Sequence, residues 1–199
     1  DLRLEQEALG IDPRRKEVLL DGGGVLYDAL LLATGATPVR PVGEGFRLPN
    51  AFVLRSLADA RAIITAAKGA HSVAILGASF IGLAAAASLR ARGLEVHVVA
   101  PEAVPLQRVL GHEVGTFVRA IHEDHGVKFH LSLMAERFDG SELHLSDGSR
   151  IAADFIVLGV GVKPNTKLAS DAALDVDNGV LVDRRMRTSD PSIFAAGDI

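Results

Sequence analysis

Hydrophobic residues fall into short runs separated by polar and glycine-rich turns. Apolar runs of strand length predict strands at residues 29–33, 72–76, 95–99, 127–131 and 155–158. Apolar residues at helical spacing predict helices at residues 57–67, 81–92 and 113–125, and Ser56 is the expected N-cap of the first. The continuous run 29–33 suits a strand covered on both faces. Strands that alternate with helices in this order predict an α/β fold with a parallel sheet.

Two Asp-Gly turns link apolar segments and predict hairpins at residues 18–26 and 142–152. A fixed offset of 126 residues aligns Asp21-Gly22 with Asp147-Gly148, and it also aligns Gly35 with Gly161. The same unit of strand, turn, strand, buried strand and glycine turn therefore occurs twice. This repeat predicts two related α/β domains, one of them represented only by its later part.

The composition of the chain excludes several classes of function. The chain has 199 residues, 48% of them hydrophobic, and a formal net charge of -4 without any Lys/Arg run, so nucleic acid is not an expected partner. The absence of Cys excludes disulfides, thiolate metal sites and a dithiol redox motif within this chain. The longest apolar stretch, near residues 81–89, is too short to span a bilayer, and the N-terminus does not resemble a secretory signal. We expect a soluble cytoplasmic protein, and both chain ends read as the edges of a piece rather than of a domain.

The strongest chemical signal is a glycine turn between a strand and a helix. The segment Gly77-Ala78-Ser79-Phe80-Ile81-Gly82 follows the run 72–76 and opens a helix rich in alanine. In a dinucleotide fingerprint, Gly77 makes the tight turn, backbone N–H groups face the pyrophosphate, and Gly82 lets the helix approach the strand. Ser79 replaces the middle glycine of that fingerprint. The alternatives are an ordinary strand-to-helix turn, or an esterase elbow with Ser79 as nucleophile, which Ile81 disfavours because that position needs a small residue.

A second position bears on the nucleotide. An acidic residue is expected at the end of the strand 95–99, where it would accept hydrogen bonds from the adenosine ribose, but that place is Ala100. Glu102 could take over the ribose of NADH, or Arg108 a 2′-phosphate, and a solvated loop is the alternative. His122 and His125 lie near a helix end without a third convergent ligand, so we predict no metal site there.

Four motifs in order resemble the pyridine nucleotide-disulfide oxidoreductase superfamily. They are residues 30–38 (LLLATGATP), 77–82 (GASFIG), 159–165 (GVGVKPN) and 193–198 (IFAAGD). Within that superfamily, residues 105–111 (PLQRVLG) look most like NADH:ferredoxin/rubredoxin reductases and apoptosis-inducing-factor-like reductases. The resemblance covers nearly the whole chain.

The resemblance implies a Rossmann-like NAD(P)-binding domain with a parallel sheet and a β-meander at residues 41–164. Residues 1–40 and 165–199 would be parts of a related FAD-binding domain. It further implies that FAD and NAD(P)H are the cofactors, with NADH weakly preferred, and that the electron acceptor is a ferredoxin or rubredoxin-like protein. The family usually has a Glu at the position of Ala84, and its FAD-binding glycine fingerprint is not in this sequence.

The resemblance also assigns individual residues. The flavin would lie near Thr34, Gly35, Gly197 and Asp198. The nicotinamide nucleotide would contact residues 77–82, Glu102, and the segment Gly159-Val160-Gly161. Two alternatives to a reductase remain at this stage: a non-catalytic NAD(H) sensor, which Ala84 would allow, and a purely structural scaffold.

Overall fold

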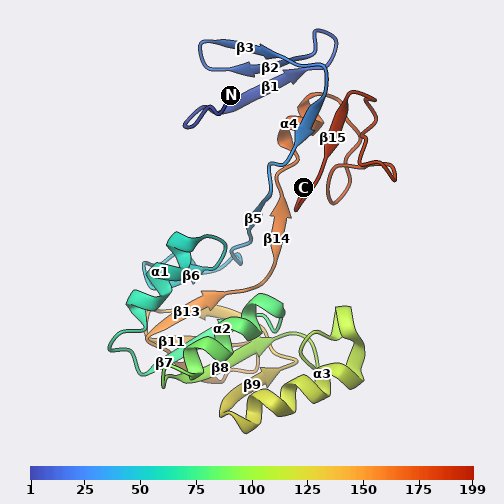
Figure 1. Cartoon of the computed structure of the whole chain (residues 1–199). Coiled ribbons are helices and arrows are strands. Elements are labelled where there is room, and N and C mark those ends of the chain that lie inside the picture. The colour runs from blue at the N-terminus through green and yellow to red at the C-terminus, as the bar shows by residue number, and fades with distance from the viewer. The chain divides into compact units, whose positions relative to one another are not determined.

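A computed structural model describes all residues 1–199 (Figure 1). The chain forms two compact units, residues 38–161 and residues 1–37 together with 162–199. The junctions lie three residues earlier than the expected 40/41 and 164/165. At these junctions, β5 (Ala36–Pro38) and β14 (Val162–Pro164) pair with each other in a short two-stranded ribbon.

The central unit, residues 38–161, is built on a five-stranded sheet. Its strand order is β6-β13-β7-β8-β9, and each neighbouring pair is parallel. The strands are β6 (Ala51–Val53), β7 (Ser72–Leu76), β8 (Glu95–Ala100), β9 (Val127–Leu131) and β13 (Phe155–Leu158). Its helices are α1 (Leu57–Ala66), α2 (Phe80–Arg90) and α3 (Gln107–Asp124).

Alternate residues of these strands enter two different cores, which explains why the strands read as continuous apolar runs. Val73 and Ile75 of β7 pack in one cluster with Ala85 and Leu89 of α2. Ala74 and Leu76 pack on the opposite face with buried residues of an antiparallel meander. That meander consists of β10 (Ala135–Phe138), β11 (Glu142–Leu145) and β12 (Arg150–Ala152). The unit therefore has three layers: helices, parallel sheet and meander.

The second unit, residues 1–37 with 162–199, repeats part of this plan. It has an antiparallel meander of β1 (Ala8–Asp12), β2 (Glu17–Leu20) and β3 (Gly23–Leu26). Strand β4 (Leu30–Leu32) pairs in parallel with β15 (Ile193–Ala195), and the short helix α4 (Lys167–Asp171) contributes Ala169 to the core. The expectation that the run 29–33 is covered on both faces is wrong for this chain. Leu31 is 59% exposed, whereas Leu32, which points to the opposite face, is buried, so only one face of β4 is covered.

The 126-residue repeat is visible in the hydrogen bonds of the two units. The amide of Leu30 donates to the carbonyl of Ser192, and the amide of Ile156, at the matching position, donates to the carbonyl of Asn50, each at 2.9 Å. Strands β15 and β6 thus play the same role beside β4 and β13. The difference is that β13 has a second parallel neighbour, β7, whereas β4 has none.

Most predicted elements are confirmed, and one helix differs in its start. Ser56 caps α1 as part of a capping box with Asp59, so that helix begins where the sequence predicts. Helix α3, expected at 113–125, begins at Gln107 after Leu106, which adopts a left-handed conformation (φ 55°). A kink at Gly111 (φ 77°) separates the first turn of α3 from the rest. The apolar residues of that turn therefore do not continue the helical spacing of the residues that follow. No helix of the chain is both long enough and apolar enough to cross a membrane.

Candidate functional site

Three chain segments meet at the carboxyl ends of neighbouring parallel strands in the central unit. Gly77 follows β7, Gly159 follows β13, and Pro101 follows β8. Backbone hydrogen bonds continue the sheet into this edge: Gly159 N–H donates to Leu76 at 2.7 Å, and Gly77 N–H donates to Val99 at 2.8 Å. Ligands of open α/β sheets bind at this edge, in the crevice outside the strand ends.

The two glycines of the turn are required by close backbone contacts. Gly77 has φ +101°, and a Cβ atom there would lie 2.4 Å from the carbonyl oxygen of Gly159. A Cβ atom on Gly82 would lie 2.1 Å from the carbonyl oxygen of Gly77. The helix therefore approaches the turn as closely as the fingerprint predicts, and any larger residue at either position displaces backbone.

Ser79 has a structural task at the start of α2. Its Oγ accepts the amide hydrogen of Gly82 at 3.3 Å as the N-cap, and its hydroxyl donates to the carbonyl of Gly159 at 3.2 Å. A serine so engaged is not poised as a nucleophile, because no histidine or carboxylate contacts its oxygen. The hydroxyl instead joins the turn to the segment after β13, and no acidic residue lies in the first turn of α2.

A cavity of about 320 Å³ opens beside this turn. Eight of the residues predicted from the sequence line this cavity: Gly77, Ala78, Ser79, Phe80, Glu102, Gly159, Val160 and Gly161. It is also lined by Arg108, which the sequence offered as a partner for a 2′-phosphate. The remaining lining residues were not predicted from the sequence, and they are Pro101, Leu106, Gln107 and Val109. Two predicted residues, Ile81 and Gly82, do not line it, and Gly82 acts through packing. The sequence predicted that α3 begins at residue 113, so the part of the cavity wall formed by its first turn was missed.

The wall formed by residues 101–109 is fixed by several contacts. The amide of Leu106 donates to the carbonyl of Ala78 at 3.1 Å, which ties the start of α3 to the glycine turn. Gly115 of α3 packs against Pro105, where a Cβ atom would come within 2.4 Å of the carbonyl oxygen. Within this wall, Arg108 Nε lies 3.0 Å from Glu102 Oε1. Glu102 and Arg108, which the sequence offered as two alternative contacts to the adenosine ribose, therefore form an ion pair on the cavity wall.

The residues predicted to lie near the flavin occur together in the other unit. Thr34-Gly35 follows β4 and Gly197-Asp198 follows β15, so both segments leave the carboxyl ends of paired parallel strands. Asn165 holds the first segment: its amide group donates to the carbonyl of Thr34 at 2.9 Å, and the Thr34 hydroxyl donates to the carbonyl of Asn165 at 2.8 Å. Gly35 and Gly197 have φ values of +66° and +90°. Both turns therefore lie at the carboxyl edge of the β4–β15 pair, and their role in flavin binding stays a prediction.

The histidines form pairs away from the cavity. His97 of β8 bonds to Glu95 through Nε2 (3.1 Å), and its Nδ1 lies 2.9 Å from His130 Nε2. Since a carboxylate only accepts, His97 Nε2 carries the hydrogen and Nδ1 accepts from His130. Burial lowers the pKa of both imidazoles. The pair is therefore neutral near pH 7.

The two histidines near the end of α3 have separate surroundings. His122 packs edge-on against Phe129, with ring centres 6.2 Å apart, and His125 Nδ1 contacts the carbonyl of Ile121 at 2.8 Å. Burial is the main cause that lowers the pKa of His122. These contacts stabilise the helix end, and no third ligand side chain joins them.

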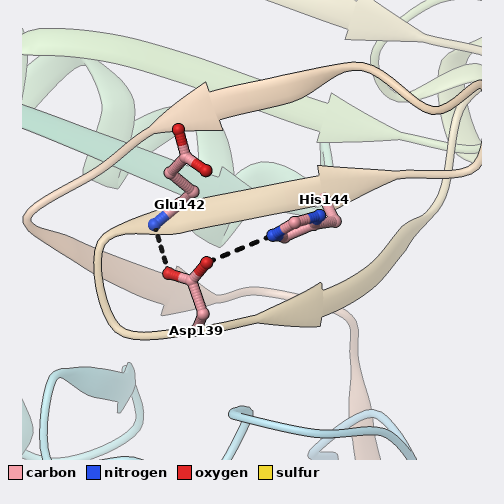
Figure 2. A group of neighbouring side chains, drawn as sticks. All are labelled: Asp139, Glu142 and His144. Carbon is pink, nitrogen blue, oxygen red and sulfur yellow. Dashed lines mark hydrogen bonds and ion pairs between the residues drawn. The ribbon is translucent and has the colours of Figure 1, made fainter.

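One cluster in the meander has the composition of a metal site, and Figure 2 shows its three side chains, Asp139, Glu142 and His144. Asp139 Oδ1 accepts the amide hydrogens of Ser141 and Glu142, and Oδ2 lies 3.2 Å from His144 Nε2. These hydrogen bonds hold the pKa of Asp139 far below its usual range. Arg137 lies 3.0 Å from the same His144 nitrogen. The hydrogen bonds of Asp139 thus close the β10–β11 turn.

Comparison with known proteins gives one consistent result. The family described as pyridine nucleotide-disulphide oxidoreductase matches residues 1–199. The ferredoxin–NAD(+) reductase component of the anthranilate 1,2-dioxygenase system of Burkholderia cepacia is 39% identical over 206 residues, covering 100% of this chain and 50% of that protein. A rubredoxin-NAD(+) reductase of Pseudomonas putida is also 39% identical, covering 99% of this chain and 53% of that protein.

Solved structures agree with the sequence relatives. The crystal structure of the ferredoxin reductase for the CYP199A2 system from Rhodopseudomonas palustris superposes with a TM-score of 0.93 at 34% identity. It is matched over 98% of this chain and 50% of that one. The chain thus spans about half the length of the relatives it matches.

Proposed function

The chain belongs to the pyridine nucleotide-disulphide oxidoreductase family, and from this premise we propose that it is the NAD(P)H-binding segment of an FAD-dependent reductase. The whole protein would pass hydride from a nicotinamide nucleotide to flavin and then electrons to a ferredoxin or rubredoxin-like acceptor. The relatives named above are reductases with NAD(+) and ferredoxin or rubredoxin in their names. The alternative of a non-catalytic NAD(H) sensor finds no support among them.

The observation that carries the proposal is the cavity at the carboxyl edge of the central sheet. A dinucleotide needs backbone that comes close to its phosphates, free N–H groups at a helix start and room for two ribose rings. The cavity has the glycine turn at residue 77, the start of α2 and about 320 Å³ of space. Residues 77–80 would face the pyrophosphate, residues 159–161 the nicotinamide end, and Glu102 the adenosine ribose.

The second unit would contribute to the flavin site. Thr34, Gly35, Gly197 and Asp198 come from the carboxyl ends of two adjacent strands, and the turns at both glycines suit a close approach of backbone to a ligand. FAD when bound supplies the conversion of a two-electron hydride into single-electron steps. This chain's own residues would position the two nucleotides. A cytoplasmic location, where NADH is supplied, is part of this proposal.

Calorimetric titration of NADH into the chain tests the nucleotide site. We expect saturable binding at one site, and its loss in Gly77→Ala, since the added Cβ atom meets the carbonyl of Gly159. Gly69→Ala is the matched control. Gly69 also has a positive φ (+85°), but nothing lies within 4 Å of its added Cβ atom, and it is outside the cavity. Equal NADH binding in both variants would contradict the proposed site.

A second measurement addresses the reductase activity of the whole protein. A bound flavin whose visible spectrum is bleached by NADH, with reduction of an added ferredoxin, is the expected result. A colourless protein that still binds NADH would instead favour the sensor.

A further inference from the structure

Two histidines on neighbouring strands of the central sheet have ring nitrogens that face each other. His97 lies on β8, and His130 lies on the edge strand β9 beside Val99. Val99 packs in the core between the sheet and the meander, so both histidines are on the meander face. His97 Nδ1 is 2.9 Å from His130 Nε2, and the stacked rings have centres 5.1 Å apart. Two good metal ligands therefore meet at a place outside the nucleotide cavity.

Glu95 decides which nitrogen of His97 is available. Its Oε1 lies 3.1 Å from His97 Nε2, and since a carboxylate only accepts, Nε2 carries the hydrogen and Nδ1 presents a lone pair to His130. Lys128 of β9 donates to the same Oε1. A histidine that binds a metal usually donates its other N–H to a carboxylate, which orients the ring and makes the ligand nitrogen more basic. Glu95 and His97 have this arrangement.

The spacing of the two nitrogens fits a shared ion. A bond between zinc and an imidazole nitrogen is about 2.1 Å long, so two such nitrogens on one ion are about 3.4 Å apart at a tetrahedral angle. The 2.9 Å separation of His97 Nδ1 and His130 Nε2 is about 0.5 Å shorter than that distance. An ion can therefore replace the shared hydrogen after rotation of the two rings. The hydrogen of His130 then moves from Nε2 to Nδ1, so the ring stays neutral.

The charges around the pair favour a cation. Glu95, Lys128 and Asp147 are the charged side chains that act on the two imidazoles, and together they carry one negative charge. Burial lowers the pKa of both rings, so both are neutral near pH 7, as a metal ligand must be. The side chain of His97 is 13% exposed, but His130 lies on the edge strand and is partly exposed. An ion can thus reach the pair from the side of His130.

From this geometry we infer that His97 and His130 form a binding site for a divalent transition-metal ion of the zinc type. The two imidazoles supply two ligands, water supplies the others, and Glu95 orients His97 without binding the ion. Imidazole suits Zn²⁺, whereas Mg²⁺ prefers oxygen ligands. The bound ion joins β8 to the edge strand of the sheet. The inference goes beyond the proposed function and does not depend on it, since neither histidine lines the cavity.

The cluster of Asp139, Glu142 and His144 offers more ligand atoms but is less suited to a cation (Figure 2). Asp139 Oδ1 already accepts two backbone amide hydrogens, and Arg137 lies 3.0 Å from His144 Nε2. The guanidinium repels a cation that approaches this nitrogen. The side chain of His144 is 15% exposed, close to the value for His97, and it also contacts a carboxylate. His144 is therefore a matched control.

Calorimetric titration of zinc chloride into residues 1–199 near neutral pH tests the site. We expect one saturable site, and an affinity at least tenfold lower in His97→Gln and in His130→Gln. Glu95→Gln should weaken binding about tenfold, because the carboxylate that orients His97 is lost. His144→Gln should bind zinc like the native chain. Magnesium chloride should give no binding.

A second measurement does not require the variants to fold. Nitrogen resonances of the imidazole rings in the native chain should shift for His97 and His130 when zinc is added, and those of His144 should stay in place. Melting temperatures check the folds of the variants. Native zinc affinity in folded His97→Gln and His130→Gln would overturn the inference. Shifts confined to other histidines, or no zinc binding by the native chain, would overturn it as well, and neither result bears on the nucleotide site.

Discussion

A Cβ atom added to Gly82 would lie 2.1 Å from the carbonyl oxygen of Gly77, although the two glycines are five positions apart in the chain. The contact is between backbone groups, so no side chain can rotate away to relieve it. The start of α2 and the end of β7 can therefore adopt their spacing only with glycine at residue 82. This relationship couples helix packing to the shape of the cavity.

The first prediction follows from this contact. Gly82→Leu should push α2 away from the turn, lower stability by about 1–3 kcal/mol and weaken NADH binding at least tenfold. Calorimetry on the folded variant measures the affinity. Ala87→Leu, at an exposed position of the same helix, should bind NADH like the native chain. Native affinity in folded Gly82→Leu would show that the turn does not bind the nucleotide.

A second prediction concerns the N-cap of α2. Ser79→Ala removes the oxygen that accepts the amide hydrogen of Gly82 and should cost about 1 kcal/mol of stability. Ser88→Ala, within the same helix, should not destabilise. Urea denaturation compares the two variants. Equal stabilities would mean that the cap contributes nothing at this site.

The third prediction is a loss of stability in weak acid. Burial lowers the folded-state pKa of His97 and His130 below 6.5, so the unfolded chain binds more protons than the folded chain. Their contribution to stability is present above pH 6.5 and is lost as pH falls from 6.5 through the lowered values. Glu95, Lys128 and Asp147 are the charged groups that act on the pair.

Denaturation in urea between pH 7.5 and 5 measures this effect. The double variant His97→Gln/His130→Gln should show a flatter dependence on pH than the native chain. His112→Gln, an exposed histidine of α3, is the control and should leave the slope unchanged. A native slope retained in the double variant would exclude the pair as its source.

The fourth prediction concerns Asp154 at a lower pH. Its carboxylate accepts amide hydrogens from His71 (2.7 Å) and Ser72 (2.9 Å), and these bonds lower its pKa. The stabilisation is therefore present above about pH 4 and is lost as the pH falls through the lowered value. Asp154→Asn should cost about 1 kcal/mol at pH 7, since the site is exposed, and less at pH 3. An equal cost at both pH values would contradict this assignment.

The fifth prediction is that residues 1–199 alone retain no FAD and show no reductase turnover. In the central unit the glycine turn at residue 77 comes from β7, which lies beside β13. In the other unit, β4 corresponds to β13 but pairs only with β15. No strand in the position of β7 therefore supplies a glycine turn beside the predicted flavin segments. A visible spectrum after FAD addition and desalting, together with NADH-dependent dye reduction, measures both points. Stoichiometric yellow protein with turnover would place the flavin site elsewhere.

The sequence by itself determined the elements whose signals are local. The runs 72–76 and 155–158 are continuous apolar segments of strand length, and the Ser56 cap and the two Asp-Gly turns depend only on nearby residues. The 126-residue repeat also required no structure, because it compares the chain with itself. Short strands such as β5, β10 and β14 were missed, since segments of three or four residues carry too little periodicity.

Only the tertiary structure decided how the cavity is closed. The left-handed Leu106 and the kink at Gly111 begin α3 six residues before regular spacing appears, and this turn supplies the wall that carries Arg108. Sequence spacing showed that Glu102 and Arg108 were both available, but not that they meet at 3.0 Å. That contact depends on a loop tied to Ala78 and Ser132 by long-range backbone hydrogen bonds. Such hydrogen bonds join residues that are far apart in the chain, so a local sequence pattern cannot predict them.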